Sequence, residues 1–311
     1  MMNRQFVLLA ILMLICGAAS AQLSMKKTDE GIMITEGGKD VLLYRTAEQN
    51  AGGKCTRCNF IHPLYGPKGS VLTEDAPSDH PFHRGIFWAW RQVFVGGKQV
   101  ADQWDLNNFE EEIIEFEFMK QRSGNVVLKT EVDWLSDHWK IDGEEMPFIK
   151  EFTRMEIWPT AGKTRRIDFE IHLRALEDGV RLGGSDDEKG YGGFSIRMKL
   201  PEDVSFSGPK GKVEPLNTAV ESQGYVNISG SIIDGKKAGG IVIIDHPENP
   251  GYPQSWILRS QNSMQNAVWP GREPVEISVA EPLVLKYTLM VYAGKMNNHK
   301  IQRFISAQSI E

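Results

Sequence analysis

The sequence has little of what marks several large classes of protein. Its 311 residues include only 3 cysteines, carry a formal net charge of -6 and contain no cluster of lysines and arginines. Because nucleic-acid binding depends on clustered positive charge, we expect no nucleic-acid partner. Beyond residue 21 no apolar run is long enough to cross a bilayer, so we expect no membrane span. No repeat of the solenoid or propeller type is visible either.

Residues 1–21 have the pattern of a secretory signal peptide. Arg4 gives a positive start, an apolar run follows, and Ala-Ser-Ala at 19–21 is a small-residue cleavage signal. We therefore expect cleavage near Ala21, a mature chain from about Gln22, and a periplasmic or secreted protein. A lipoprotein anchored through Cys16 is the alternative interpretation.

The mature chain keeps two cysteines, Cys55 and Cys58. In an oxidising compartment they could form a short-loop disulfide, which would stabilise little. Together with His62 they could also be three metal ligands, although one C-x2-C pair is a weak zinc signal. The third interpretation is two partly buried small residues near a turn.

Alternation of apolar and polar residues with a period of two is the main pattern after residue 22. It is clearest at 125–134, 165–173 and 283–292, and half-buried antiparallel strands have this pattern. Turn-forming clusters separate further expected strands, which are 41–45, 85–95, 111–119, 150–158, 194–200, 225–233 and 240–245. Only residues 298–310 have helical spacing.

Many antiparallel strands without intervening helices predict an all-β sandwich or barrel. No linker rich in proline or serine divides residues 22–311, so we expect a single large antiparallel β-sandwich with a short C-terminal helix. Long polar loops are expected at 46–82, 174–193 and 245–272. Function should be sought there, because loops carry most binding and catalytic residues.

The stretch SDHPFHRGIFWAW, residues 78–90, is unusually dense in polar and aromatic groups. The proline between His80 and His83 favours an irregular loop in which both imidazoles can converge. Asp79 is placed to orient an imidazole, and Arg84 to bind carboxylate or hydroxyl oxygens with its planar fork. A ligand site, a metal site and a structural network that locks the loop remain alternatives.

A second cluster is DDEKGYGGFSIRMKL, residues 186–200. Its glycines permit close backbone approach, but the spacing is not that of a phosphate loop and no helix follows. Lys189 and Tyr191 should project from the bend, with Arg197 on the next strand. The alternative is a glycine-rich hairpin with a solvated lysine.

A third cluster, DHPENPGYPQSWILRS at 245–260, repeats the Asp-His-Pro of the first. The prolines stiffen this loop, and the residues able to contact a polyhydroxylated ligand are His246, Asn249, Tyr252, Trp256 and Arg259. The alternative is a proline-rich Ω-loop.

The chain also has 8 tryptophans. Trp88 and Trp104 are candidates for binding the apolar face of a sugar, although tryptophan is also a common core residue.

Four stretches together resemble a bacterial family labelled "PmoA" and known as DUF6807, a family of unknown function. They are FIHPLYGPKGSVLTEDAPSDHPFHRGIFWAW, KGYGGFSIR, DHPENPGYPQSWILR and LVLKYTLMVYAG, within residues 40–295. The methane-oxygenase label is at odds with a chain without a membrane span. The resemblance implies a supersandwich similar to galactose mutarotase-like proteins, and a place in secreted carbohydrate-degrading repertoires.

We therefore expect a carbohydrate-active enzyme of the hydrolase, lyase or epimerase type, with a sugar or oligosaccharide as its partner. A non-catalytic sugar-binding protein is the first alternative. The second is a metal-dependent enzyme with His80, His83 and His246 as ligands, so no cofactor is assigned and a metal stays open. The candidate catalytic residues are Asp79, His80, His83 and His246. The candidate substrate-binding residues are Arg84, Trp88, Trp104, Lys189, Tyr191, Arg197, Asn249 and Arg259.

Overall fold

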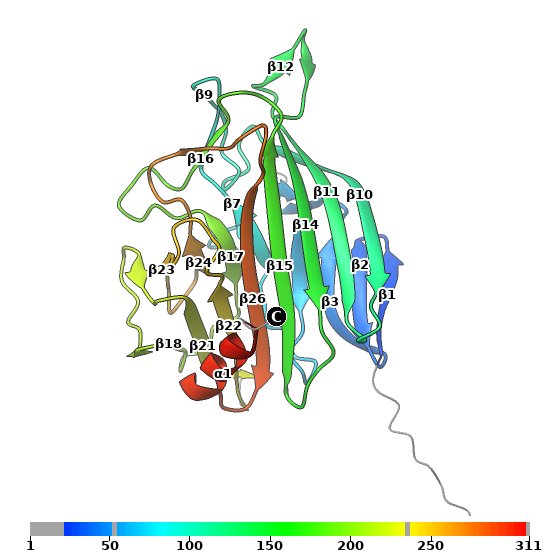
Figure 1. Ribbon diagram of the computed structural model, residues 1–311, viewed down its shortest axis with the longest axis vertical. Helices are drawn as coiled ribbons and strands as arrows, with labels where there is room; N and C mark the ends of the chain where they lie inside the picture. The colour runs from blue at the N-terminus through cyan, green and yellow to red at the C-terminus, as the bar shows by residue number, and fades with distance from the viewer. Residues whose placement is uncertain (1–21, 52–54, 234–236, 309–311) are drawn as a thin grey trace, which may run out of the picture.

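Two large β-sheets stacked face to face form the body of the protein (Figure 1). The computed structural model describes residues 22–51, 55–233 and 237–308, so the predicted signal peptide lies outside the described residues. Each large sheet has nine strands, and the strand pairings within them are antiparallel. The predicted all-β sandwich is confirmed.

The first sheet has, in spatial order, β1 (Leu23–Thr28), β2 (Gly31–Glu36), β3 (Lys39–Arg45), β6 (Phe60–Leu64), β7 (Ile86–Ala89), β17 (Gly193–Arg197), β24 (Met264–Val268), β23 (Ser255–Ile257) and β20 (Val220–Glu221). The second has β10 (Glu110–Lys120), β11 (Val126–Leu135), β14 (Ile149–Ile157), β15 (Thr164–Ala175), β26 (Leu283–Ala293), β22 (Lys237–Asp245), β21 (Tyr225–Ile233), β18 (Ser205–Gly208) and β19 (Gly211–Lys212).

Smaller elements cap the sandwich. A four-stranded sheet contains β25 (Val275–Glu276), β16 (Arg181–Gly183), β8 (Gln92–Val95) and β9 (Lys98–Ala101). Two short hairpins are β4 (Gln49–Ala51) with β5 (Cys55–Arg57), and β12 (Lys140–Ile141) with β13 (Glu144–Glu145). The helix α1 (Asn298–Gln308) confirms the predicted C-terminal helix.

Apolar side chains from both large sheets meet in one core between them. In β15 the alternate residues Ile167, Phe169, Ile171 and Leu173 are buried, because successive side chains of a strand point to opposite faces. The same alternation splits β7. Trp88 joins the core, whereas Phe87 belongs to a separate apolar cluster. That second cluster therefore lies on the outer face of the first sheet.

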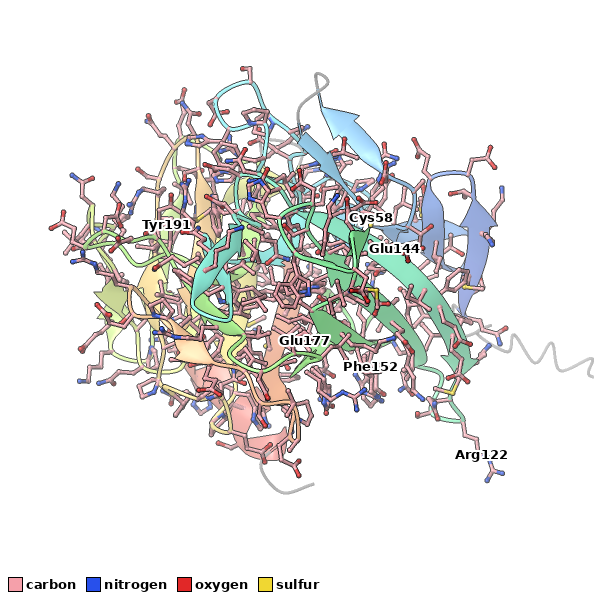
Figure 2. All side chains as sticks on the ribbon, turned by 90° about the horizontal axis from the view of Figure 1, so that it is seen from above. Cys58, Arg122, Glu144, Phe152, Glu177 and Tyr191 are labelled. Carbon is pink, nitrogen blue, oxygen red and sulfur yellow. The ribbon has the colours of Figure 1, made fainter. Side chains whose placement is uncertain are left out.

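A third apolar cluster covers the outer face of the second sheet. In β22, Ile241 and Ile243 belong to the core, whereas Val242 and Ile244 pack with Ile301 of α1. Figure 1 shows α1 lying across the lower ends of β21, β22 and β26. In Figure 2 the labels Tyr191 and Phe152 fall on different sides of the molecule, and the helix lies on the Phe152 side. The molecule thus has two distinct outer faces.

One carboxylate lies inside the core. Glu151 of β14 is fully buried and accepts hydrogen bonds from the indoles of Trp88 (2.9 Å) and Trp134 (3.1 Å). Its other oxygen accepts from Asn59 Nδ2 at 3.0 Å and Thr153 Oγ1 at 2.9 Å. Because Trp88 belongs to the first sheet and Trp134 to the second, Glu151 ties the two sheets together.

Two expectations about strands and loops need correction. The stretch 85–95 is not one strand, because β7 ends at Ala89 in the first sheet and β8 begins at Gln92 in the four-stranded sheet. The expected long loops also contain strands: β6 lies within 46–82, β16 within 174–193, and β23 and β24 within 245–272. These strands have only three to five residues each, so local alternation gives little sign of them.

Candidate functional site

The loop before β7 folds back over the outer face of the first sheet. Its backbone is anchored by Glu74 N donating to Arg197 O at 3.0 Å and Gly85 N donating to Glu74 O at 2.8 Å. Gly85 has a φ of 28°, and a Cβ there would lie 1.9 Å from the carbonyl oxygen of Ile61. Only glycine permits so close an approach, and this holds the loop at the start of β7.

The two histidines of this loop are brought together. The rings of His80 and His83 are stacked, with centroids 4.6 Å apart and an interplanar angle of 2°. His80 Nδ1 lies 2.7 Å from Asp79 Oδ2. A carboxylate can only accept, so Nδ1 carries a proton, and in the neutral form of the ring the lone pair lies at Nε2. The side chain of His80 is 38% exposed, which leaves Nε2 accessible from outside.

Arg197 holds Asp79 in place. Phe194 and Ile196 of β17 point into the core, so Arg197 points to the outer face, where it is almost fully buried. Its guanidinium pairs with both oxygens of Asp79 at 3.0 Å, and its Nε donates to Glu74 Oε2 at 2.9 Å. Burial opposes ionisation of Asp79, but hydrogen bonds from His80 and Arg197 outweigh it and hold the pKa of Asp79 at about 2.

His83 is the buried member of the stack. Burial, reinforced by the nearby charges of His80 and Arg197, lowers the pKa of His83 to about 3, so this ring is neutral. Its Nδ1 is buried without a hydrogen-bond partner among the described residues. Phe82 and Trp104 approach it edge-on, with centroids 5.0 and 5.7 Å away. His83 is therefore suited to supporting His80 by stacking rather than to carrying a proton.

Aromatic and charged groups border the histidines. Tyr191 is partly buried and packs on Trp104 at a centroid distance of 4.7 Å, and its hydroxyl accepts from Arg91 at 2.7 Å. Arg91 also pairs with Asp102 at 3.0 Å and with Asp105. We call the surface formed by Asp79, His80, Phe82, Tyr191 and Arg197, with His83 beneath it, the His80 face. Lys189 lies two residues before Tyr191, and its partly exposed side chain is 3.7 Å from Asp187.

A buried charged group lies behind Phe87. Arg57 stacks on the Phe87 ring at 5.1 Å and donates to Gln103 O at 2.6 Å, and Gln103 Nε2 donates to Glu111 Oε1 at 3.2 Å. Burial is the main cause that raises the pKa of Glu111 to about 8, although the charge of Arg57 opposes it. Glu111 is therefore a buried carboxylic acid that is largely protonated at neutral pH.

Replacing Glu111 with glutamine should change how stability depends on pH. Because the folded-state pKa of about 8 exceeds the ordinary 4.5, the group's contribution to stability is complete below pH 4.5 and is lost as the pH rises through 8. Glutamine keeps the shape and stays neutral. We expect the two proteins to differ little at about pH 5 and the variant to be more stable by roughly 3 kcal/mol at about pH 8.5. Urea unfolding at both pH values checks this, and an equal difference at both would contradict it.

Two candidate residues of the first cluster do not reach the His80 face. Trp88 lies on the core side of β7 and donates to Glu151. Arg84 is 1% exposed, pairs with both oxygens of Asp75 and donates to Gln49 O at 3.0 Å. Its planar fork is engaged inside the protein, so it locks the loop instead of meeting a ligand. Trp104 is also buried, but it packs directly against His83.

The third cluster is divided between the two sheets, because its first part follows β22 of the second sheet and its last part contains β23 of the first. His246 follows β22 and lines a cleft on the outer face of the second sheet, on the opposite side of the sandwich from His80. Asn249 is buried and bonds to Asp245 and to the backbone of Lys286, which fixes its own loop. Arg259 donates to the carbonyl oxygens of Leu216, Asn217 and Leu258. The expected meeting of all three clusters is thus corrected: His246 and its loop do not join the face that the first two clusters form.

The potential metal ligands do not gather. Within 22–51, 55–233 and 237–308 no group of three His, Cys, Asp or Glu side chains has an arrangement that could hold a metal ion. His246 is separated from the stacked pair His80 and His83, because it lies on the opposite outer face. Cys58 is a buried free thiol that donates to Glu111 O, whereas His62 contacts Thr73 at 3.0 Å. The side chain of Cys55 lies outside the described residues.

Sequence reasoning missed several groups at this site. Glu74, Arg91, Asp102 and Glu111 all take part in its ion pairs or its buried interior. Glu74 lies four residues before the stretch 78–90 and Arg91 directly after it, so their closeness in sequence to the histidines could have identified these two residues. Nothing local singles out Glu111, because it is one of three consecutive glutamates at the start of β10.

A protein-family model matches residues 31–306, and its description is a family of unknown function, DUF6807. The protein belongs to the DUF6807 family. The match covers both large sheets almost completely and all the residues of the His80 face. No curated protein matches this DUF6807 chain. In the described part of the chain, no helix is long and apolar enough to cross a membrane.

Proposed function

We propose that this DUF6807 protein is a carbohydrate-active enzyme that uses His80 for acid–base chemistry on a sugar or glycoside. The observation that carries the proposal is the ordered chain from Arg197 through Asp79 to His80. An ionised carboxylate that fixes the tautomer of an accessible imidazole is the arrangement that general-base catalysis needs.

In the proposed reaction His80 Nε2 removes a proton from the substrate or from an attacking water. Asp79 stabilises the imidazolium that forms, and Arg197 keeps Asp79 ionised through the step. His80 then returns the proton to the leaving oxygen as the bond to that oxygen breaks. The same residue can serve in both directions because the ring regains its neutral tautomer at the end.

The surroundings support a sugar as the substrate class. Phe82 and Tyr191 are partly exposed aromatic rings next to the histidines, suited to the apolar C–H face of a sugar ring. Lys189 is a partly exposed cation two residues from Tyr191 that could bind a hydroxyl group or a developing negative charge. A periplasmic or secreted location, expected from residues 1–21, agrees with this substrate and belongs to the proposal.

Turnover on a panel of neutral, acidic and oxidised glycosides tests the proposal. We expect the wild-type protein to convert at least one class and Asp79→Asn to convert it more slowly, because the amide no longer fixes the charged ring. Saturable sugar binding at the His80 face without turnover would favour the alternative, a non-catalytic sugar-binding protein. Turnover that is equal in the wild type and Asp79→Asn would remove the assigned roles.

A further inference from the structure

A cleft of about 810 Å³ opens on the outer face of the second sheet, beside α1. Strands β14, β15 and β26 form its floor, the loop after β22 forms one wall, and α1 contributes Gln302, Phe304, Ile305 and Ser306. Its volume is within the range of sites for small molecules, about 300–1,000 Å³. The His80 face lies on the opposite side of the sandwich, so this cleft is a separate feature.

The charges in the cleft are already paired with one another. Arg154 bonds to Glu156 at 2.6 Å, Arg166 to Asp168 at 2.7 Å and Lys286 to Glu248 at 2.6 Å. Each of the three cations that line the cleft therefore has a carboxylate partner, while the carboxylates of Glu170 and Asp245 add negative charge. An anionic ligand would find no spare cation, so this lining disfavours phosphate and uronate groups.

Two polar groups in the cleft lack partners among the described residues. The Tyr225 hydroxyl is buried and makes no hydrogen bond. His246 Nδ1 accepts from the backbone N–H of Glu248 at 3.2 Å, which places the ring proton on Nε2. Burial lowers the pKa of His246, although Glu248 opposes the shift, and this keeps the ring neutral. The cleft thus offers a neutral N–H donor at its wall and an unsatisfied hydroxyl at its base.

An aromatic ring is exposed at the edge of the cleft. Tyr252 is 41% exposed and lies over Gly224, where a Cβ would come within 2.7 Å of the tyrosine hydroxyl. Glycine at this position lets the ring lie across the end of the cleft. A large exposed aromatic side chain next to hydrogen-bonding groups is the combination that recognises a ring with one apolar and one hydroxylated side.

We propose that this cleft is a second ligand site, which binds an uncharged saccharide with one ring against Tyr252 and hydroxyl groups directed to His246 and the cleft carboxylates. Hydroxyl groups both donate and accept, so they match a lining that contains free acceptors on carboxylates and a free donor on an imidazole. The inference does not depend on the proposed catalysis, because the cleft and the His80 face share no residue.

The test is a calorimetric titration of the mature chain with glucose, galactose, xylose, cellobiose and maltose, and with glucuronate as the anionic comparison. The titrations use the His80→Ala background, so that turnover cannot consume the sugar. We expect at least one neutral sugar to bind, and Tyr252→Ala and His246→Ala each to weaken it by about tenfold or more. Tyr252→Phe should retain binding, because the ring is preserved.

Phe152→Ala is the matched control, since Phe152 is a 38% exposed aromatic residue of β14 that does not line the cleft (Figure 2). It should leave the affinity unchanged. Three results would overturn the inference: no saturable binding of any neutral sugar at millimolar concentration, binding that Tyr252→Ala leaves intact, or tighter binding of glucuronate than of every neutral sugar. A failure here leaves turnover at His80 unaffected, so the two proposals are tested separately.

Discussion

Replacing Glu151 with alanine should lower the free energy of unfolding by roughly 3–5 kcal/mol. The substitution leaves the indole N–H groups of Trp88 and Trp134 and the amide of Asn59 without an acceptor inside the core. It also opens a cavity between the two sheets. Relief from burying a charge offsets part of this loss, because burial raises the pKa of Glu151 against the hydrogen bonds that lower it.

Glutamine at position 151 should destabilise as well. Each carboxylate oxygen accepts two hydrogen bonds, so an amide NH₂ would face donors whichever way it is turned. Urea unfolding of Glu151→Ala and Glu151→Gln measures both effects. The control is Glu112→Ala, an exposed glutamate of β10, which should change stability by less than about 0.5 kcal/mol. A loss below about 1 kcal/mol for Glu151→Ala would show that the core does not depend on this carboxylate.

Replacing His80 with alanine should reduce kcat about 10²- to 10⁴-fold on whichever sugar the wild-type protein converts, with a small effect on KM. The proposed proton transfer uses His80 Nε2, and the neighbouring His83 cannot replace it, because burial lowers its pKa to about 3. The side chain of His80 is 38% exposed, so the variant should fold and melt like the wild type.

Steady-state kinetics at several pH values distinguish a catalytic role from a structural one. His80→Ala should remove the pH dependence that belongs to the general base, whereas Asp79→Asn should lower kcat less severely. His138→Ala is the matched control, because His138 is an exposed histidine in the loop between β11 and β12. An unchanged kcat in His80→Ala, with normal thermal stability, would contradict the assignment.

Strand positions were readable from sequence where alternation is long and regular. The predicted stretches 125–134, 165–173 and 283–292 correspond to β11, β15 and β26, and the predicted helix at 298–310 to α1. Each of these elements buries one face in an apolar cluster, and this burial requires regularly spaced apolar residues along its whole length. The strands β1 and β2 were not expected, and β7 and β8 were merged, because their patterns are short or are buried on both faces.

At the candidate site, sequence proximity grouped Asp79, His80 and His83, and the structure places them in contact. The sequence did not show that Arg84 and Arg197 have different roles. Both are buried arginines, but one pairs with Asp75 and locks the loop, whereas the other pairs with Asp79 and holds a potential catalytic residue. Arg84 meets a carboxylate 9 residues away, whereas Arg197 meets one that is 118 residues away in the chain, and only the folded structure reveals the second pairing.

The sequence by itself determined the class of fold. Apolar and polar residues alternate with a period of two in many segments, and segments of this kind bury their apolar faces by forming antiparallel sheets. Only the tertiary structure decided where the chemistry lies. The tripeptide Asp-His-Pro occurs at 79–81 and again at 245–247, yet the first lies over the first sheet and the second over the other. Local alternation indicates which side chains of a strand face the core, but the sheet that contains each tripeptide depends on pairings such as β22 with β26 and β17 with β7, which join segments far apart in the chain.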